Sequence, residues 1–266
     1  MRTRASIALL LPLACLLGCT LPYTPSPLTG NWQIQSGTAI TSPPTYPYLV
    51  GALQGTNSAL TGTFTAQIYT VNSTVESYSG TFNPSTGSLV LNSTLPLPAN
   101  QTTAALSVPA NPTDLATGTL VDQCGVCANG ISTQVVGVEV APLNGTYTGT
   151  LSGTLNTYSP FTSTPITGTT SVTFTQSATP NASGQFPLTG TITFPSSSGL
   201  GTASLGGTVS GIGLTLGFYS TAVVGPNISL TAYTNPTASQ ITITNLGFSS
   251  GLASENAAYT GTLTLQ

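Results

Sequence analysis

The sequence predicts an all-β protein made of two tandem small antiparallel β-barrels, with about eight strands in each. The chain contains 29 Gly and 20 Pro, which favours frequent turns over long helices. Thr, Val, Ile and Tyr dominate the segments between the turns, and these residue types favour strands. Apolar and polar residues alternate with a period of two in 60–68, 212–218 and 259–265, which indicates strands with one buried face.

The two halves of the chain resemble each other. Residues 28–32 (LTGNW) resemble 143–147 (LNGTY), LTGT at 60–63 recurs at 188–191, and GT at 80–81 recurs at 207–208. These matches keep the same order, which predicts a duplication with an insertion around 156–165. We therefore expect one barrel over residues 28–142 and a second over 143–266.

The expected strands of the first barrel are 29–36, 47–54, 58–69, 75–83, 87–93, 102–108, 115–122 and 131–140. Those of the second are 144–155, 167–177, 185–194, 202–210, 212–219, 226–234, 239–248 and 257–266. Eight antiparallel strands in each half suit a closed barrel, which leaves no exposed edge. A β-sandwich in each half is the main alternative, and one large barrel across both halves is another.

The start of the chain has the layout of a signal peptide. Arg2 and Arg4 precede an apolar run over 7–17, which is shorter than the ~20 residues that a bilayer span needs. Residues 16–19 (LLGC) resemble the lipobox of bacterial lipoproteins. The resemblance implies an N-terminal signal helix within residues 1–18, acylation of Cys19 by chains such as palmitate, and Cys19 as the mature N-terminus. An ordinary signal peptide that ends near a cysteine is the alternative.

Residues 19–27 follow as a tether with three prolines, a composition that favours a stiff, extended segment. Two or more acyl chains hold a protein firmly to a membrane. Thr20 follows the lipobox cysteine where an acidic residue would favour the inner membrane. We therefore expect a membrane-anchored protein of the cell envelope, at the outer membrane or cell surface.

Charge narrows the possible functions. Both basic residues lie in the signal peptide, so residues 19–266 contain no Lys, Arg or His. Nucleic-acid binding needs basic residues against phosphates, and the common nucleophilic triads need a histidine base. Zinc sites need several His and Cys ligands. We expect no enzymatic activity, no catalytic residues, no metal site, no cofactor and no nucleic-acid partner.

The acids give no catalytic pair. The chain has Glu76, Asp114, Asp122, Glu139 and Glu255. Asp114 and Asp122 bracket one expected strand, where eight residues place them about 26 Å apart, too far for a glycosidase pair. We interpret all five as solvated carboxylates.

Cys124 and Cys127 form the one compact motif of reactive residues, Cys-Gly-Val-Cys. A redox pair would need a helix to begin there, but Ala-Asn-Gly follows and favours a turn. Haem attachment would need a histidine at 128, and a metal site would need two further ligands. A structural disulfide suits an exported protein, and its small ring would stiffen the loop more than the barrel.

A second resemblance concerns the opening of the first barrel. Gly30-Asn31-Trp32 resembles the Gly-x-Trp motif of lipocalin-like barrels, and the repeated Gly-Thr strands resemble two-repeat bacterial lipoproteins of unassigned activity. The lipocalin resemblance implies that Trp32 closes one end of a barrel beneath a basic side chain. This chain has no such basic residue, and its second half has Tyr147 in place of tryptophan.

Two functions remain for a lipoprotein of this kind. One barrel could bind a small apolar or neutral ligand, which requires a cavity of about 300 Å³ or more. Alternatively the protein is a structural or surface-interaction (adhesin-like) protein that contacts envelope components or glycans, and a contiguous exposed aromatic patch would favour this function.

Overall fold

A computed structural model describes residues 28–55, 59–67, 74–95, 101–110, 114–123, 131–158, 160–198, 201–220, 227–249 and 255–266. The expected signal helix and tether lie outside these residues. The described part contains sixteen strands and one short 3-10 helix.

The first barrel consists of eight antiparallel strands. They are β1 (Gly30–Ser36), β2 (Tyr48–Gly55), β3 (Ala59–Gln67), β4 (Thr74–Asn83), β5 (Ser88–Ser93), β6 (Gln101–Ser107), β7 (Ala116–Gln123) and β8 (Ile131–Val140). Each strand pairs with the next, and β8 returns to pair with β1, which closes the barrel. Closure leaves the sheet without a free edge.

The second barrel repeats this order. Its strands are β9 (Asn144–Tyr158), β10 (Phe161–Gln176), β11 (Phe186–Thr193), β12 (Thr202–Ser210), β13 (Gly213–Ser220), β14 (Asn227–Thr234), β15 (Gln240–Ser249) and β16 (Glu255–Leu265), with the 3-10 helix η1 (Ser196–Ser198) between β11 and β12. Pairing of β16 with β9 closes the barrel.

The structure confirms two tandem eight-stranded barrels, so the sandwich and the single large barrel are wrong. The observed strands lie close to the expected ranges, and the longest difference is the β9–β10 hairpin. Its ladder continues to the pair Phe161 and Tyr158, whereas residues 37–47 connect β1 to β2. The connection between β10 and β11 in the second barrel, 177–185, is also longer than the matching connection between β2 and β3 in the first barrel, 56–58.

Inward-pointing residues fill the first barrel, because alternate side chains of a strand share one face. Its core cluster contains Trp32, Ile34, Leu49, Leu53, Leu60, Phe64, Tyr78, Leu89, Leu91, Leu106 and Leu120, among others. The rings of Phe64 and Tyr78 meet edge to face, with centroids 5.3 Å apart, a favourable arrangement of aromatic pairs.

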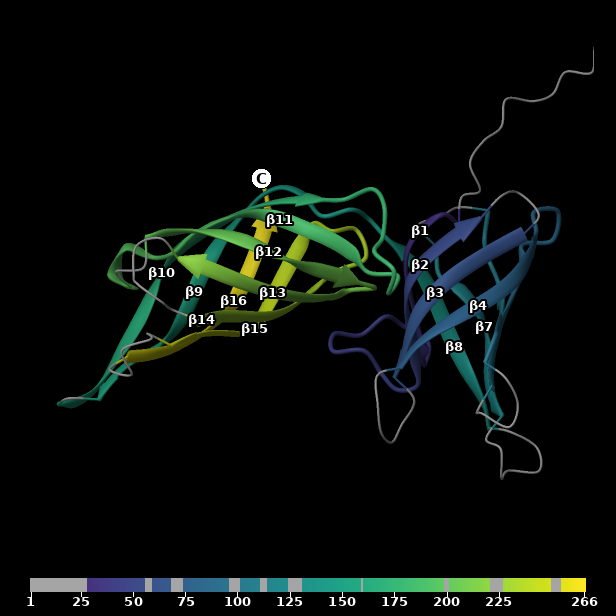
Figure 1. Ribbon diagram of the computed structural model, residues 1–266, viewed down its shortest axis with the longest axis horizontal. Helices are drawn as coiled ribbons and strands as arrows, with labels where there is room; N and C mark the ends of the chain where they lie inside the picture. Colours follow the sequence, from purple (N-terminus) through teal and green to yellow (C-terminus); the bar gives the residue numbers. More distant parts are fainter. Residues whose placement is uncertain are drawn as a thin grey trace, which may run out of the picture.

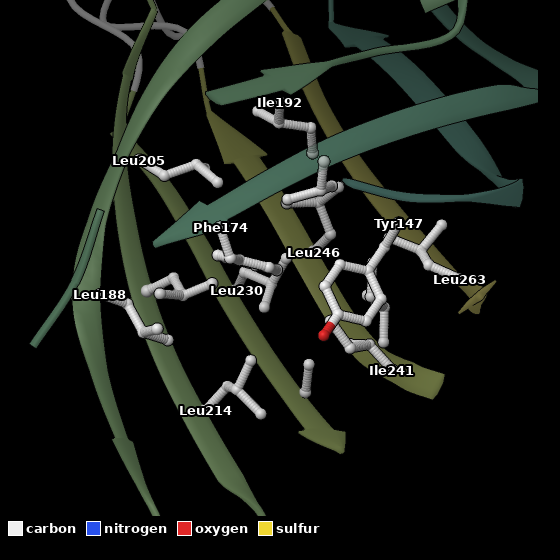
Figure 2. Close-up of a cluster of buried hydrophobic side chains, with 14 of the residues drawn as sticks. Tyr147, Phe174, Leu188, Ile192, Leu205, Leu214, Leu230, Ile241, Leu246 and Leu263 are labelled. Atoms are coloured by element: carbon white, nitrogen blue, oxygen red, sulfur yellow. The ribbon is translucent and has the colours of Figure 1, made fainter. Parts of the chain in front are cut away.

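The second barrel has its own core of inward-pointing side chains, which converge from all around the wall (Figure 2). Tyr147 and Phe174 lie against each other there, with ring centroids 5.9 Å apart. Leu188, Leu205, Leu214, Leu230 and Leu246 surround them. Both barrels are therefore packed with side chains through their middle, so space for a ligand has to be sought at their ends.

The loops at one end of the second barrel face the side of the first barrel that carries β1 and β2 (Figure 1). The burial of β1 reflects this arrangement, since all of Asn31 to Ser36 is buried instead of every second residue. A strand with both faces buried has a core on one side and a partner on the other. The two barrels therefore meet end to side.

Candidate functional site

The end of the first barrel at Trp32 carries a pocket of about 480 Å³. Leu28 and Trp32 form its most deeply buried part, with 1% and 3% of their surfaces exposed. The Trp32 indole Nε1 donates a hydrogen bond to the Leu28 carbonyl over 2.9 Å, so the polar atom of the ring is satisfied inside the protein. Trp32 therefore closes the barrel core and leaves an apolar floor for whatever enters the pocket.

Two loops form the walls of this pocket. The β4–β5 turn contributes Pro84 to Gly87, and the segment after β6 contributes Val108 to Ala110 together with Asp114. The Val108 amide donates to the Gly87 carbonyl over 2.7 Å. Gly87 has φ +69°, and a side chain on it would overlap the Val108 carbonyl oxygen. A glycine at 87 thus allows the two loops to lie close together.

Phe82 and Val108 are half-buried in the walls, whereas Ser85, Thr86 and Asp114 are exposed. The pocket therefore has an apolar interior and a polar outer part. Asp114 is the charged residue among those that line it.

The equivalent end of the second barrel is closed. Tyr147 takes the position of Trp32, and its hydroxyl donates to the Ala238 carbonyl over 2.6 Å. Ala238 belongs to the β14–β15 loop and is 3% exposed. The Asn235 side-chain oxygen accepts hydrogen bonds from the amides of Ser239 and Gln240, which holds this loop across the barrel end.

The closed end also rests on the outer wall of the first barrel. The wall consists of the outward-facing residues of β8, β1 and β2 that are buried: Val136, Val138, Val140, Asn31, Gln33, Gln35, Val50 and Ala52. Ala52 packs with the core cluster of the second barrel. Valines on both sides of a row of amide side chains give a surface that excludes water and still offers hydrogen bonds.

The row of amides on β1 bonds to the β12–β13 turn of the second barrel. Asn31 Nδ2 donates to the Gly211 carbonyl over 2.8 Å, and the Gly211 amide donates back to Asn31 Oδ1 over 2.7 Å. The Ile212 amide donates to Gln33 Oε1 over 3.2 Å. Gln33 donates in turn to Gln35, and Gln35 donates to the Thr41 hydroxyl. Buried amide groups need such partners, because each one left unpaired costs about 1–3 kcal/mol.

Gly211 fits this contact because it lacks a side chain. Its φ is +55°, a left-handed conformation that glycine adopts without steric cost. A Cβ atom there would overlap Gln33 Oε1 and lie 2.7 Å from Val50 Cγ1.

The sequence pattern indicated Trp32 as a barrel-end residue, but it did not indicate the contact roles of Asn31, Gln33 and Gly211. The consecutive apolar pairs at 49–50 and 135–136 were the available signal that these strands are buried on both faces.

A smaller pocket of about 200 Å³ lies between the barrels, with Gln33, Tyr48, Val50 and Tyr233 in its lining. Burial raises the pKa of the Tyr48 hydroxyl well above its usual value, and the neighbouring Tyr46 hydroxyl raises it further. Tyr48 is therefore a neutral phenol throughout the physiological pH range.

The acids do not all behave as the sequence predicted. Glu76 is buried, at 6% exposed, so its interpretation as a solvated carboxylate was wrong. Its Oε2 accepts hydrogen bonds from the hydroxyls of Tyr78 over 3.0 Å and Ser93 over 3.3 Å. Alternation along β4 places Glu76 on the same inward face as Tyr78.

Glu139 lies on β8 directly opposite Trp32 in the ladder, half-buried. Burial raises the pKa of its carboxyl group, because desolvation disfavours the charged form. Asp122 belongs to β7 and Glu255 to β16.

The predicted lipidation site Cys19 and the predicted disulfide Cys124–Cys127 lie outside the described residues, so both stay predictions. Among the residues that the structure describes, no group of three or more His, Cys, Asp or Glu side chains could hold a metal ion. In the same part of the chain, no helix has the length and apolar character to cross a membrane.

Comparison with known proteins adds little to this description. No family model matches the chain, and no curated protein sequence matches it. One similar solved structure is the vaccine antigen Transferrin Binding Protein B (TbpB) from Haemophilus parasuis Hp5, in a mutant form. It is 13% identical with a TM-score of 0.31, over 89% of this chain and 59% of that one. The chain thus spans less than two thirds of that protein's length.

Proposed function

We propose that this protein is a non-enzymatic lipoprotein of the bacterial cell envelope that binds a small apolar or neutral ligand at the Trp32 end of its first barrel. The observation that carries the proposal is the pocket of about 480 Å³ above Leu28 and Trp32. Its volume falls in the range of about 300–1,000 Å³ that is usual for small-molecule sites. Its lining combines apolar side chains with a few hydroxyls, as such sites require.

The position of the pocket agrees with an anchor at Cys19. Leu28, in the pocket floor, follows Cys19 by nine residues. Even when fully extended, nine residues reach only about 30 Å. An acylated Cys19 would therefore keep the pocket close to the membrane, which is a source of apolar molecules.

The alternative, a structural or surface-interaction protein, has less support. Its expected sign was a contiguous exposed aromatic patch. The exposed aromatic side chains of the described part include Tyr46 on the first barrel and Phe161 at the tip of the β9–β10 hairpin. These two belong to different barrels and do not form one patch.

Binding can be measured with N-phenyl-1-naphthylamine, a neutral apolar fluorophore. Trp32 is the single tryptophan of the chain, so energy transfer from tryptophan reports probe bound near Trp32, and a substitution in the pocket wall assigns that probe to this pocket. We expect saturable transfer, and a loss of affinity of about tenfold or more in Phe82→Ser, because the half-buried wall residue would lose its apolar contact. Val75→Ser, at a residue that is 51% exposed on β4, is the matched control and should bind like the parent protein.

Mass spectrometry of the protein purified from its own envelope tests the anchor separately. Acylation predicts a mature protein that begins at Cys19 and carries the added mass of its acyl chains. An unmodified Cys19, or absence of saturable energy transfer to Trp32, would contradict the corresponding half of the proposal.

A further inference from the structure

We propose that the Trp32 pocket selects single-chain apolar cations, such as alkylamines, over neutral and anionic molecules of the same size. This inference rests on the proposed binding of apolar ligands at this pocket, and it narrows that proposal to ligands with a positive head group in place of a neutral one. It follows from the positions of the lining side chains, since apolar ones form the floor and Asp114 lies in the outer part.

The inner part of the pocket accepts an apolar body. Leu28 and Trp32 are almost fully buried at the floor, and Phe82 and Val108 are half-buried in the walls. The Trp32 indole N–H already donates to the Leu28 carbonyl. The floor therefore offers apolar surface to a ligand and no hydrogen bond from this ring nitrogen, so a hydrocarbon chain fits it better than a polar group.

The outer part of the pocket carries negative charge. Asp114 is exposed and lines the pocket together with the hydroxyl-bearing Ser85 and Thr86. A ligand whose apolar chain enters first would place its polar head near this carboxylate. A positive head is attracted there and a negative head is repelled, since unit charges a few ångströms apart interact appreciably even in water.

The rest of the chain reinforces this preference. Residues 19–266 contain five acids and no Lys, Arg or His, so no basic side chain of the mature protein can pair with an anionic head. The overall negative field also attracts cations to the surface and repels anions from it. Fatty acid anions are therefore poor ligands for this pocket, even though their chains would fit its floor.

The pocket walls are held in a way that favours one ligand orientation. The hydrogen bond from the Val108 amide to the Gly87 carbonyl joins the two loops that form the walls. Both loops follow strands of the closed barrel. The bond holds Val108 beside the β4–β5 turn that carries Ser85 and Thr86, so the two walls are positioned before a ligand binds, which reduces the ordering cost of binding.

Octylamine, 1-octanol and octanoate form a series that differs only in the head group. Each is titrated against the protein purified from its own envelope at pH 7 and low salt, with displacement of N-phenyl-1-naphthylamine from the Trp32 pocket as the signal. We expect octylamine to bind about fivefold more tightly than 1-octanol, and octanoate to bind about fivefold more weakly. At 1 M salt the three affinities should converge, because screening is then effective over a few ångströms.

Asp114→Asn separates the two proposals. The variant should keep its affinity for 1-octanol and lose most of the advantage of octylamine, and Ser85→Ala is the control that leaves the charge in place. Equal binding of all three compounds by the parent protein, or an unchanged octylamine preference in Asp114→Asn, would overturn the charge selection while the binding function stands. If neither the naphthylamine probe nor any member of the series binds, both proposals fail.

Discussion

The Trp32 end of the first barrel and the Tyr147 end of the second occupy equivalent positions in the same strand order, yet only the second is closed. Its β14–β15 loop covers Tyr147, and the Ala238 carbonyl of this loop accepts a hydrogen bond from the Tyr147 hydroxyl. At the first barrel the corresponding segments instead form the walls of a pocket. The comparison shows that the strands determine the barrel, whereas the loops at its end determine whether that end can hold a ligand.

The outer faces of the barrels differ as well. Asn31, Gln33 and Gln35 point outward from β1 and are buried against the second barrel. The corresponding residues of β9 are Thr146, Thr148 and Thr150, which are half-buried or exposed. The first barrel therefore receives the second barrel's end, and the second barrel has no equivalent amide row on β9.

Removal of the Asn31 amide, which makes two hydrogen bonds to Gly211, should destabilise this arrangement most. Asn31→Ala leaves the buried amide and carbonyl of Gly211 without their partners, and we expect a loss of about 2–5 kcal/mol in the free energy of unfolding. Guanidinium unfolding followed by circular dichroism measures it. Asn92→Ala, at an exposed position on β5, should change stability by no more than about 0.5 kcal/mol. A loss below about 1 kcal/mol in Asn31→Ala would contradict the role of this contact.

A side chain on the β12–β13 turn of the second barrel should reduce stability somewhat less. Gly211→Ala introduces a left-handed alanine, at about 1 kcal/mol, and an overlap with Gln33 and Val50 that costs a further ~1–2 kcal/mol. Solution scattering should show the barrels less closely associated. Gly206→Ala is the matched control, since its Cβ would have no atom within 4 Å. Equal stability and equal solution scattering of the two variants would argue against close packing at the turn.

The smallest expected change in stability concerns Glu139, the acid at the open end of the first barrel. Glu139 lies opposite Trp32, whereas Leu265 lies opposite Tyr147 in the second barrel. Because burial raises the folded-state pKa of Glu139, its protonated form stabilises the fold below the unfolded pKa of about 4.3, and this stability is lost as pH rises through the folded pKa. Glu139→Gln should therefore be more stable than the parent at pH 7 and equally stable near pH 4. A lower denaturant midpoint at pH 7 for Glu139→Gln than for the parent would show that ionised Glu139 stabilises the fold.

Much of the fold could be predicted from the sequence because period-two alternation and turn residues are local signals. Leu60, Gly62 and Phe64 point inward as their alternation predicted. The role of Asn31 and Gln33 could not be predicted in this way. A polar residue between two inward-pointing ones has the same pattern whether water or another barrel's backbone satisfies its amide. Glu76 was misplaced for a related reason, since its partners Tyr78 and Ser93 come together only when β4 and β5 are paired.

The pocket was predicted only in part. The sequence indicated that Trp32 closes a barrel end, but the depth of the pocket depends on residues 84–87 and 108–110 and on Asp114. Their short, Pro- and Gly-containing sequences indicate turns without indicating how far apart two turns lie. The Val108–Gly87 hydrogen bond joins segments that are distant in the sequence, and no periodic pattern records such a contact.

In the end-to-side contact, the first barrel contributes the side of its wall and the second barrel contributes its end. The two surfaces are therefore different. A contact of this kind repeats indefinitely when every unit carries both surfaces. Here the threonines of β9 replace the amides of β1, so a third barrel would find no receiving face on the second. Growth of this architecture by further duplication would therefore require amide side chains at 146, 148 and 150, together with apolar neighbours on the adjoining strands. The three outward threonines of β9 thus leave the second barrel without the amide side chains by which β1 binds a neighbouring barrel.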